Sequence, residues 1–344
     1  MRRRRFLQLL VTAIGGGMAG DELERAWELL DLGRARPDSA FLAGLQDTTR
    51  RLLVRSREAR PALLAAPIQD HLAGLRGLLR GSVPEALRTR LLATTAETAM
   101  VAAHNAFLLG MPGLAQRRLE LGLALSREAG DPALQGAFLA REAEFTHSSR
   151  YGLAGDDRRA LQLLDQAASL AGPRAEPVLL AGILASRGEQ HAAVGDVEGC
   201  LRDLERAQEL LQPRGPSRPG VLPISNLTEL AAVRGSAEVR LAAVAPAQAR
   251  AAAATLARVD AEMPAVHGPW RATVLADRGA AHALQGEAEE AASTLAEALE
   301  LTERVGARHN VPRIARYHRR HLGGLDLPAV RDLGDRLRAA GVPH

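Results

Sequence analysis

The chain has 344 residues, of which 47% are hydrophobic but only 3% are aromatic. Most of its apolar residues are alanine and leucine, which favour helices, whereas strands need β-branched and aromatic residues, so the composition predicts an all-α protein. All 44 basic residues are arginine, which excludes mechanisms that need a catalytic or phosphate-binding lysine. The net charge of +4 is modest for this length and gives nucleic-acid binding only weak support.

The N-terminal segment has two interpretations. Residues 3–7 read RRRFL and precede a short apolar run, an order that resembles a twin-arginine export signal. We favour the alternative, an amphipathic first helix with a basic start, because the apolar run spans only about nine residues. Gly15, Gly17 and Gly20 also fit a dinucleotide-binding pattern, but no second strand follows, so we predict no cofactor there.

Three helices are predicted before the regular part of the chain begins. They cover residues 21–32, 38–57 and 61–79, and the last of them starts with Pro61 and stops at Gly81. These helices lack the repeat pattern that follows. We therefore assign residues 1–82 to an N-terminal helical platform.

A nine-residue pattern then recurs. Residues 187–195 and 278–286 share Arg, Gly, His, Ala and Gly at five matching places, and a weaker copy begins at Arg234. A pattern that recurs at a multiple of a fixed period predicts stacked helical repeats. The expected turn residues are Gly110, Gly155, Gly195, Ala242 and Gly286. Their spacing of 40 to 47 residues exceeds the roughly 34 residues of a tetratricopeptide repeat, so longer helices or connections are expected.

Small residues follow each expected turn at fixed distances. Because small side chains let two helix axes approach to about 8 Å, these positions are expected where helices cross. Cys200 occupies one of them, which predicts a buried and unreactive thiol. The positions five residues after the turn are Ala115, Ala160, Cys200, Ala247 and Ala291, and those seven residues further on are Gly122, Ala167, Ala207, Ala254 and Ala298.

These patterns predict a right-handed stack of about five helix pairs, a tetratricopeptide-like solenoid that forms an α–α superhelix. The repeats occupy residues 83–325. A last amphipathic helix at 328–340, with a proline in its first turn, predicts a C-terminal capping segment over 326–344.

The chain also resembles a known family. The turn pattern is similar to tetratricopeptide repeats, and further stretches resemble the C-terminal sensor region of actinobacterial helix-turn-helix regulators of the xenobiotic-response-element type. These stretches are residues 3–7, 45–52, 69–72, 75–79 and 121–131. In that family the repeat array senses a signal and is joined to an N-terminal DNA-binding domain. No helix-turn-helix precedes the array here, so the resemblance implies a cytoplasmic regulatory protein that does not itself contact DNA.

The repeated pattern contains the first candidate site. Arg187 and His191 lie four residues apart, and so do Arg278 and His282, so each pair shares a helix face. With Arg234, these residues could form a ladder on the concave surface that holds carboxylates or phosphates of a ligand or peptide terminus. We favour the alternative, in which each arginine pairs with a glutamate of an adjacent helix.

Two further charged clusters have a functional and a structural interpretation. The run from Arg313 to His321 could contact nucleic acid or an acidic partner, but we interpret it as a solvated helix face. A second cluster could act as an acid–base group, but we interpret it as exposed charged surface. It consists of Arg141, Glu142, Glu144 and His147.

No metal-ligand spacing and no Ser–His–Asp pattern is evident, so we predict no catalytic, metal-binding or cofactor-binding residues. The function we expect is a non-enzymatic, regulatory interaction protein that binds a protein, a peptide or a small ligand in its concave groove. Self-association through an end face is a further expectation, whereas direct nucleic-acid contact and a membrane span are not expected.

Two alternatives stay open. An exported helical binding protein would have its mature N-terminus near residue 20. An enzyme with a site assembled from distant residues would show a deep, closed pocket with converging polar groups.

Overall fold

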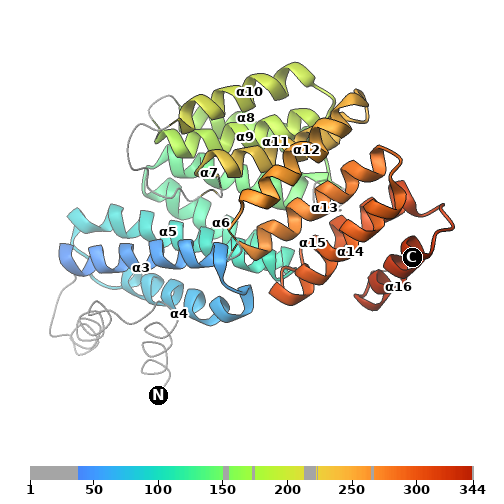
Figure 1. The fold of residues 1–344 in the computed structure, drawn as a ribbon. Coiled ribbons are helices and arrows are strands. Elements are labelled where there is room, and N and C mark those ends of the chain that lie inside the picture. The colour runs from blue at the N-terminus through green and yellow to red at the C-terminus, as the bar shows by residue number, and fades with distance from the viewer. Residues whose placement is uncertain are drawn as a thin grey trace.

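The computed structural model describes residues 38–149, 155–172, 175–212, 222, 224–264 and 267–342, and every regular element in these ranges is a helix (Figure 1). The all-α prediction is therefore confirmed. The helix predicted at 21–32, the export-signal candidate and the glycine pattern at 15–20 lie outside the described residues. None of the helices in the described ranges is both long and apolar enough to cross a membrane.

The described chain begins with a helical hairpin. Helix α3 (Ser39–Glu58) starts at Asp38, whose carboxylate accepts a hydrogen bond of 2.7 Å from the Phe41 backbone N–H and so caps the helix. Helix α4 (Pro61–Arg80) begins with a proline, which lacks only a backbone donor that would be unpaired at this position. Both helices agree with the predicted ranges and pack against α5 (Glu85–Leu108).

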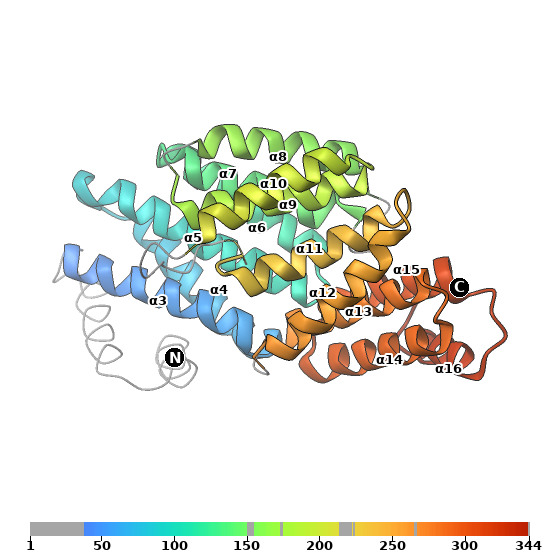
Figure 2. The ribbon, with the colours of Figure 1, turned by 45° about the horizontal axis from the view of Figure 1, so that its top comes forward.

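Antiparallel helix pairs follow, and the second helix of each pair packs against the first helix of the next (Figures 1 and 2). The predicted helical-pair solenoid is therefore confirmed. A terminal group formed by α15, α16 and the π-helical turn η3 completes the stack, and α16 packs on α14. The pairs are α5 with α6 (Pro112–Glu128), α7 (Pro132–Glu142) with α8 (Asp157–Ala171), α9 (Pro177–Ala193) with α10 (Val197–Leu211), α11 (Leu227–Leu241) with α12 (Ala247–Glu262), and α13 (Gly268–Leu284) with α14 (Ala288–Val305).

The remaining elements are α15 (Asn310–Tyr317), η3 (His318–Leu322), α16 (Pro328–Ala339) and η1 (Ala143–His147), a second π-helical turn that extends α7. The predicted boundaries between platform, repeats and cap fall in connections, after α4 and before α16.

The glycines of the recurring pattern lie where paired helices cross. A Cβ at Gly188 would lie 3.1 Å from Leu204, and one at Gly279 would lie 2.7 Å from Leu295. The other glycines, Gly195 and Gly286, have φ of +81° and make the left-handed turn that joins the two helices of a pair. Two glycines of each copy therefore have different roles, since one allows close helix packing and the other allows the turn.

The turn between α11 and α12 departs from the prediction. Sixteen residues separate Gly188 from Leu204 across the α9–α10 turn, whereas twenty-one separate Gly235 from Leu256, its counterpart here. An alanine at 242 does not readily adopt the positive φ of the other turns, and the connection is longer. Ala252 and Val259 consequently take the buried places predicted for Ala247 and Ala254, both of which are exposed.

Gly155 also differs from its predicted role. It does not have the positive φ of the turn glycines. Instead it lets two backbone segments approach, because a Cβ at this position would lie 2.0 Å from the carbonyl oxygen of His147 at the end of η1. The glycine is needed for space rather than for a left-handed turn.

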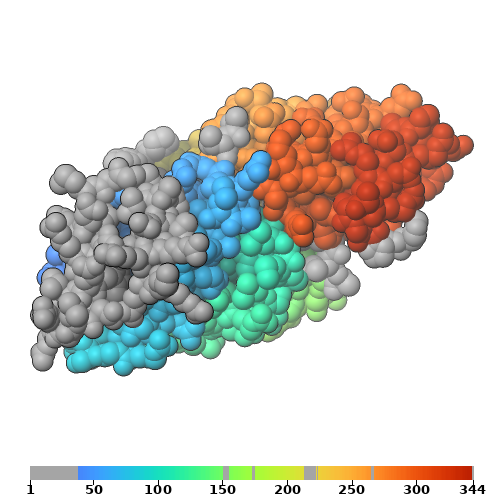
Figure 3. Space-filling model, turned by 90° about the horizontal axis from the view of Figure 1, so that it is seen from below, coloured from blue at the N-terminus to red at the C-terminus, as the bar shows by residue number. Residues whose placement is uncertain are grey.

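The curved stack closes on itself. Helix α3 contacts α13, and the backbone N–H of His309 lies 3.4 Å from the carbonyl oxygen of Leu108 at the end of α5. Figure 3 shows the N-terminal helices, in blue, directly against the C-terminal repeats, in orange. The first helices of the pairs, together with α15, therefore surround an interior that α3 covers on one side, and we call them the inner helices.

The helix crossings predict that Gly279→Ala destabilises the protein. Alanine normally stabilises a helix interior relative to glycine by about 1 kcal/mol, but here the new methyl group would overlap Leu295, at a cost of about 1–3 kcal/mol. Gly77→Ala in α4 is the matched control because nothing lies within 4 Å of its new Cβ, and it should raise the thermal midpoint. A midpoint for Gly279→Ala at or above that of the wild type would contradict the crossing.

Candidate ligand-binding pocket

A pocket of about 730 Å³, including its open mouth, lies on the axis of the stack. This figure counts the solvent-filled space at the mouth as well as the space between the side chains. Helix α3 and all six inner helices, or the residues next to their ends, contribute to its wall. The lining residues are Ser56, Arg57, His104, Phe107, Leu108, Arg141, Glu144, Phe145, Ser186, Ile224, Val233, His267, Pro269, Trp270, Thr273 and His309.

Arg141 is the most buried charged group of the pocket wall, with 3% of its side chain exposed. Its Nη1 lies 2.5 Å from Oε2 of Glu144, its Nη2 lies 3.4 Å from Nδ1 of His104, and its guanidinium carbon lies 4.9 Å from the Phe145 ring centroid. The buried Nε makes no hydrogen bond with any described residue. Arg141 therefore retains a donor beside the pocket.

Arg57 brings the C-terminal end of α3 into the interior. Its Nη2 donates to the carbonyl oxygen of Leu222 at 2.9 Å, and its Nη1 donates to Ser225 Oγ at 3.1 Å and lies 3.4 Å from Glu229 Oε1. Burial lowers the pKa of Arg57; Glu229 opposes this shift, and the nearby charge of Arg141 adds to it. Two guanidinium groups thus share one pocket, and Arg57 connects α3 to the start of α11.

His104 lies in a positive electrostatic environment. Its pKa lies well below the usual value, first because the ring is buried and then because of the charges of Arg141, His309 and Arg57. The imidazole is therefore neutral at pH 7. Aromatic rings form the wall beside it, since Phe107 and Phe145 stack at a centroid distance of 4.0 Å and His309 lies tilted on Phe107 at 5.1 Å.

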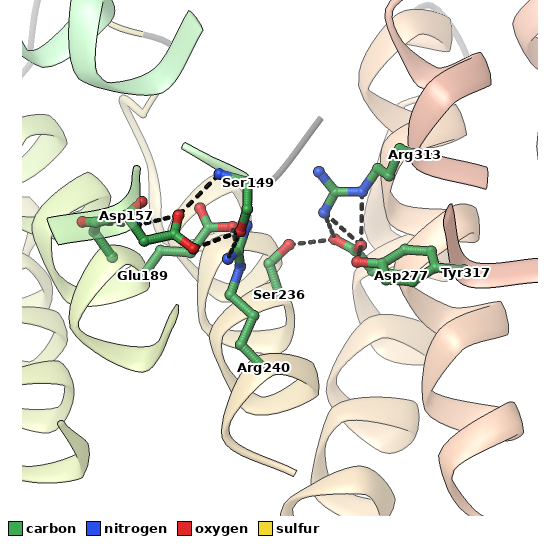
Figure 4. A network of polar contacts seen from close by, with 9 residues as sticks. Ser149, Asp157, Glu189, Ser236, Arg240, Asp277, Arg313 and Tyr317 are labelled. Atoms are coloured by element: carbon green, nitrogen blue, oxygen red, sulfur yellow. Dashed lines mark hydrogen bonds and ion pairs between the residues drawn. The ribbon is translucent and has the colours of Figure 1, made fainter. Parts of the chain in front are cut away.

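A buried ion pair connects two inner helices beyond the pocket (Figure 4). Asp277 of α13 accepts hydrogen bonds from Arg313 Nε at 2.8 Å and from the Tyr317 hydroxyl at 2.8 Å, both of which belong to α15. Ser236 of α11 donates a further hydrogen bond to the same carboxylate. Because these donors surround the carboxylate, the charge pair is satisfied without solvent.

A second group of polar contacts lies on the other side of α11 (Figure 4). Arg240 lies 3.5 Å from Glu189 Oε1 of α9 and donates to Ser149 Oγ at 3.3 Å, and Asp157 accepts from Ser149 N–H and from Gln190. Desolvation would raise the pKa of Asp157, but these hydrogen bonds together lower it below the usual value. Both groups join neighbouring inner helices and lie outside the pocket wall.

The five residues of the predicted arginine ladder are not among the lining residues. Arg187 donates to both carboxylate oxygens of Asp203 in α10, at 2.6 and 2.7 Å, and His191 Nδ1 lies 2.7 Å from Asp196 Oδ2 in the following turn. The favoured alternative of pairing with an adjacent helix thus describes Arg187, although its partner is an aspartate rather than a glutamate.

The other members of the ladder make comparable contacts. Arg278 Nη1 lies 3.8 Å from Asp260 of α12, and His282 Nδ1 lies 2.6 Å from Glu287 in the turn. Arg234 donates a long hydrogen bond of 3.5 Å to Gln208. Ligand binding by these residues stays a prediction, and the contacts show how they connect the helices of the stack.

The interpretation of 313–321 as a solvated helix face is wrong for its first half. Arg313 is fully buried against Asp277, and Arg316 lies over the Tyr317 ring at 5.3 Å. Arg319 and Arg320 are exposed, as predicted. The difference arises because α15 is an inner helix, which buries Arg313, whereas Arg319 and Arg320 belong to the π-helical turn η3 and are exposed.

The interpretation of 141–147 as exposed surface is also wrong for the two residues that matter most. Arg141 and Glu144 line the pocket because α7 is an inner helix and η1 continues it into the interior. The other lining residues were not singled out from the sequence. Several are isolated polar or aromatic residues on predicted first helices, such as His104 and Trp270, and that position is the signal that could have found them.

No protein-family model matches the chain, and no curated protein matches its sequence. No three His, Cys, Asp or Glu side chains of the described ranges gather as metal ligands would. The fold and the pocket are therefore the features that bear on function.

The buried ion pair predicts that Arg313→Met destabilises the protein by about 3–5 kcal/mol, because the carboxylate of Asp277 would remain buried without its cation. Arg206→Met is the matched control, because Arg206 and Glu209 form an ion pair in which both side chains are about 60% exposed, and its loss should cost less than about 1 kcal/mol. Denaturant unfolding compares the two variants, and equal losses would contradict a structural role for the buried pair.

The lone cysteine is buried, with 1% of Cys200 exposed, and burial raises the pKa of its thiol to about 12. Because the thiolate is the reactive form, the native protein should react with an aromatic disulfide reagent at pH 8 far more slowly than the unfolded chain. The rate of this reaction is measured by absorbance with and without denaturant. A fast reaction of the native protein would show that the thiol is accessible.

Proposed function

We propose that this protein is a non-enzymatic binding protein with a regulatory role in the cytoplasm, and that its ligand is a small molecule held in the axial pocket. The observation that carries the proposal is the composition of the wall, to which α3 and every inner helix contribute. Loops and surface grooves seldom collect residues from so many elements, whereas small-molecule sites commonly lie between the helices of a bundle.

The closure of the stack favours a compact ligand over an extended peptide. Arg57, at the end of α3, lies inside the concave groove and is hydrogen-bonded to Leu222 and Ser225. An extended peptide needs a continuous open groove in which successive side chains find pockets. A protein or peptide partner on another surface stays a prediction.

A regulatory role is favoured because one ligand would contact several elements of the stack at once. The pocket wall includes Arg57 of α3, Trp270 of α13 and His309 at the start of α15, which are far apart in the sequence. A ligand that contacts all three stabilises the closed form of the stack, because binding to one state shifts the population toward it. The resemblance to sensor regions of regulators supports the same role.

The pocket also keeps an enzyme as the second candidate, since His104, Arg141 and Glu144 converge in it. Efficient general acid–base catalysis needs a pKa near the working pH. The pKa of His104 lies well below 7, and Arg141 and Glu144 are engaged with each other, so these groups suit binding better than proton transfer.

Ligand capture tests the proposal. The full-length protein is incubated with a mixture of common metabolites, separated by size exclusion and analysed by mass spectrometry. Ser186→Trp, which fills the pocket from α9, is the matched control. We expect the wild type to retain at least one unmodified small molecule that the variant loses. Identical retention by both proteins would count against binding in the pocket, and recovery of a chemically altered compound would favour the enzyme.

A further inference from the structure

We propose that the ligand of the axial pocket is an organic carboxylate with an apolar or aromatic body, whose anionic group is bound by Arg141. This inference rests on the proposed function and deepens it by naming the chemical class. The carboxylate would pair with the guanidinium group of Arg141, and the body would lie along the aromatic and aliphatic wall.

Arg141 has a donor that no described residue pairs. An arginine has five N–H donors and no acceptor, and a carboxylate matches its planar arrangement. In the described structure Glu144 takes Nη1, His104 lies at a long distance from Nη2, and Nε makes no hydrogen bond. A buried donor without an acceptor costs free energy, so a ligand acceptor at this position is favoured over an apolar group.

The charge around the pocket favours an anionic ligand. Two guanidinium groups, those of Arg57 and Arg141, belong to the wall, whereas Glu144 is its single carboxylate. Glu144 already pairs with Arg141, and Glu229, outside the wall, pairs with Arg57 and accepts from the backbone and hydroxyl of Ser225. A cationic ligand would have to compete with an arginine for either carboxylate, whereas an anion meets an arginine that has a donor to give.

Much of the remaining wall is apolar. Phe107, Leu108, Ile224, Val233 and Trp270 supply an apolar surface next to the charged groups. Burying such a surface favours a ligand body with matching apolar area, at roughly 25 cal/mol per Å². A phosphate monoester, with a charge of about −1.5 to −2 at pH 7, would bury more charge against this apolar wall than a carboxylate does. A monocarboxylate on an apolar body fits both parts of the wall.

The test uses one molecular body with four head groups. The probes are 4-phenylbutanoate, its neutral amide, the amine 4-phenylbutylamine and the phosphate monoester of 4-phenylbutanol. Binding to the full-length Trp27→Phe protein is followed by the fluorescence of Trp270, the chain's other tryptophan, and by calorimetry. We expect the carboxylate to bind at least tenfold more tightly than each of the other three.

Three variants locate the preference. Arg141→Gln should reduce the ratio of carboxylate to amide affinity to near one, and Arg141→Lys, which keeps the charge but loses the Nε donor, should leave an intermediate ratio. Arg206→Gln is the control, because Arg206 is about 60% exposed in its ion pair with Glu209, lies outside the pocket wall and should leave the ratio unchanged. Thermal unfolding of each variant shows whether it is folded before its affinities are compared.

The outcomes separate the two proposals. Tighter binding of the amide, amine or phosphate than of the carboxylate, lost in Ser186→Trp, overturns the carboxylate inference and leaves the pocket as a ligand site. An unchanged carboxylate preference in folded Arg141→Gln or Arg141→Lys also overturns it. If no probe binds and the metabolite mixture yields no compound that depends on the pocket, both proposals fail together.

Discussion

The closure of the curved stack determines what each inner helix must bury. In an open solenoid the first helix of a pair faces solvent on its concave side, and its polar residues need no partner. Here α3 contacts α13, and the backbone of His309 contacts the carbonyl oxygen of Leu108, so much of the concave side is buried apart from the open mouth of the pocket. The polar groups of the inner helices that this closure buries are stabilised by partners within the protein, because an unpaired buried polar group costs about 1–3 kcal/mol.

The polar residues of the interior divide into two sets under this constraint. The first set satisfies itself across helix interfaces, as Asp277 does with Arg313, and so holds neighbouring inner helices in register. The second set surrounds the pocket, where Arg141 keeps an unmatched donor beside apolar rings. The same closure that makes the first set structural thus leaves the second set around the pocket with a donor that no described residue pairs, and a water or a ligand could complete it.

The fold could be predicted from the sequence to a larger extent than the site. Close helix crossings require glycine at positions such as Gly188 and Gly279, and these local requirements recur in the chain and reveal the repeats. The predicted register is wrong after Ala242, where the helix crossing comes five residues later than in the α9–α10 pair, and nothing in the spacing indicated the change. The site could not be predicted, because the closure of the stack depends on the small rotations between all successive helix pairs. The contacts that this closure creates join residues far apart in the sequence, such as Arg57 and Glu229, which are separated by 172 residues.

The position of α3 decides how ligand binding can influence the rest of the molecule. A ligand at a hundred times its dissociation constant stabilises the state that binds it by about 2.7 kcal/mol. For a ligand in this pocket that energy would act on contacts between α3 and the inner helices, since Arg57 and Ser56 belong to the same wall as Trp270 and His309. Such a ligand would therefore hold α3 more firmly against α13 than in the free protein.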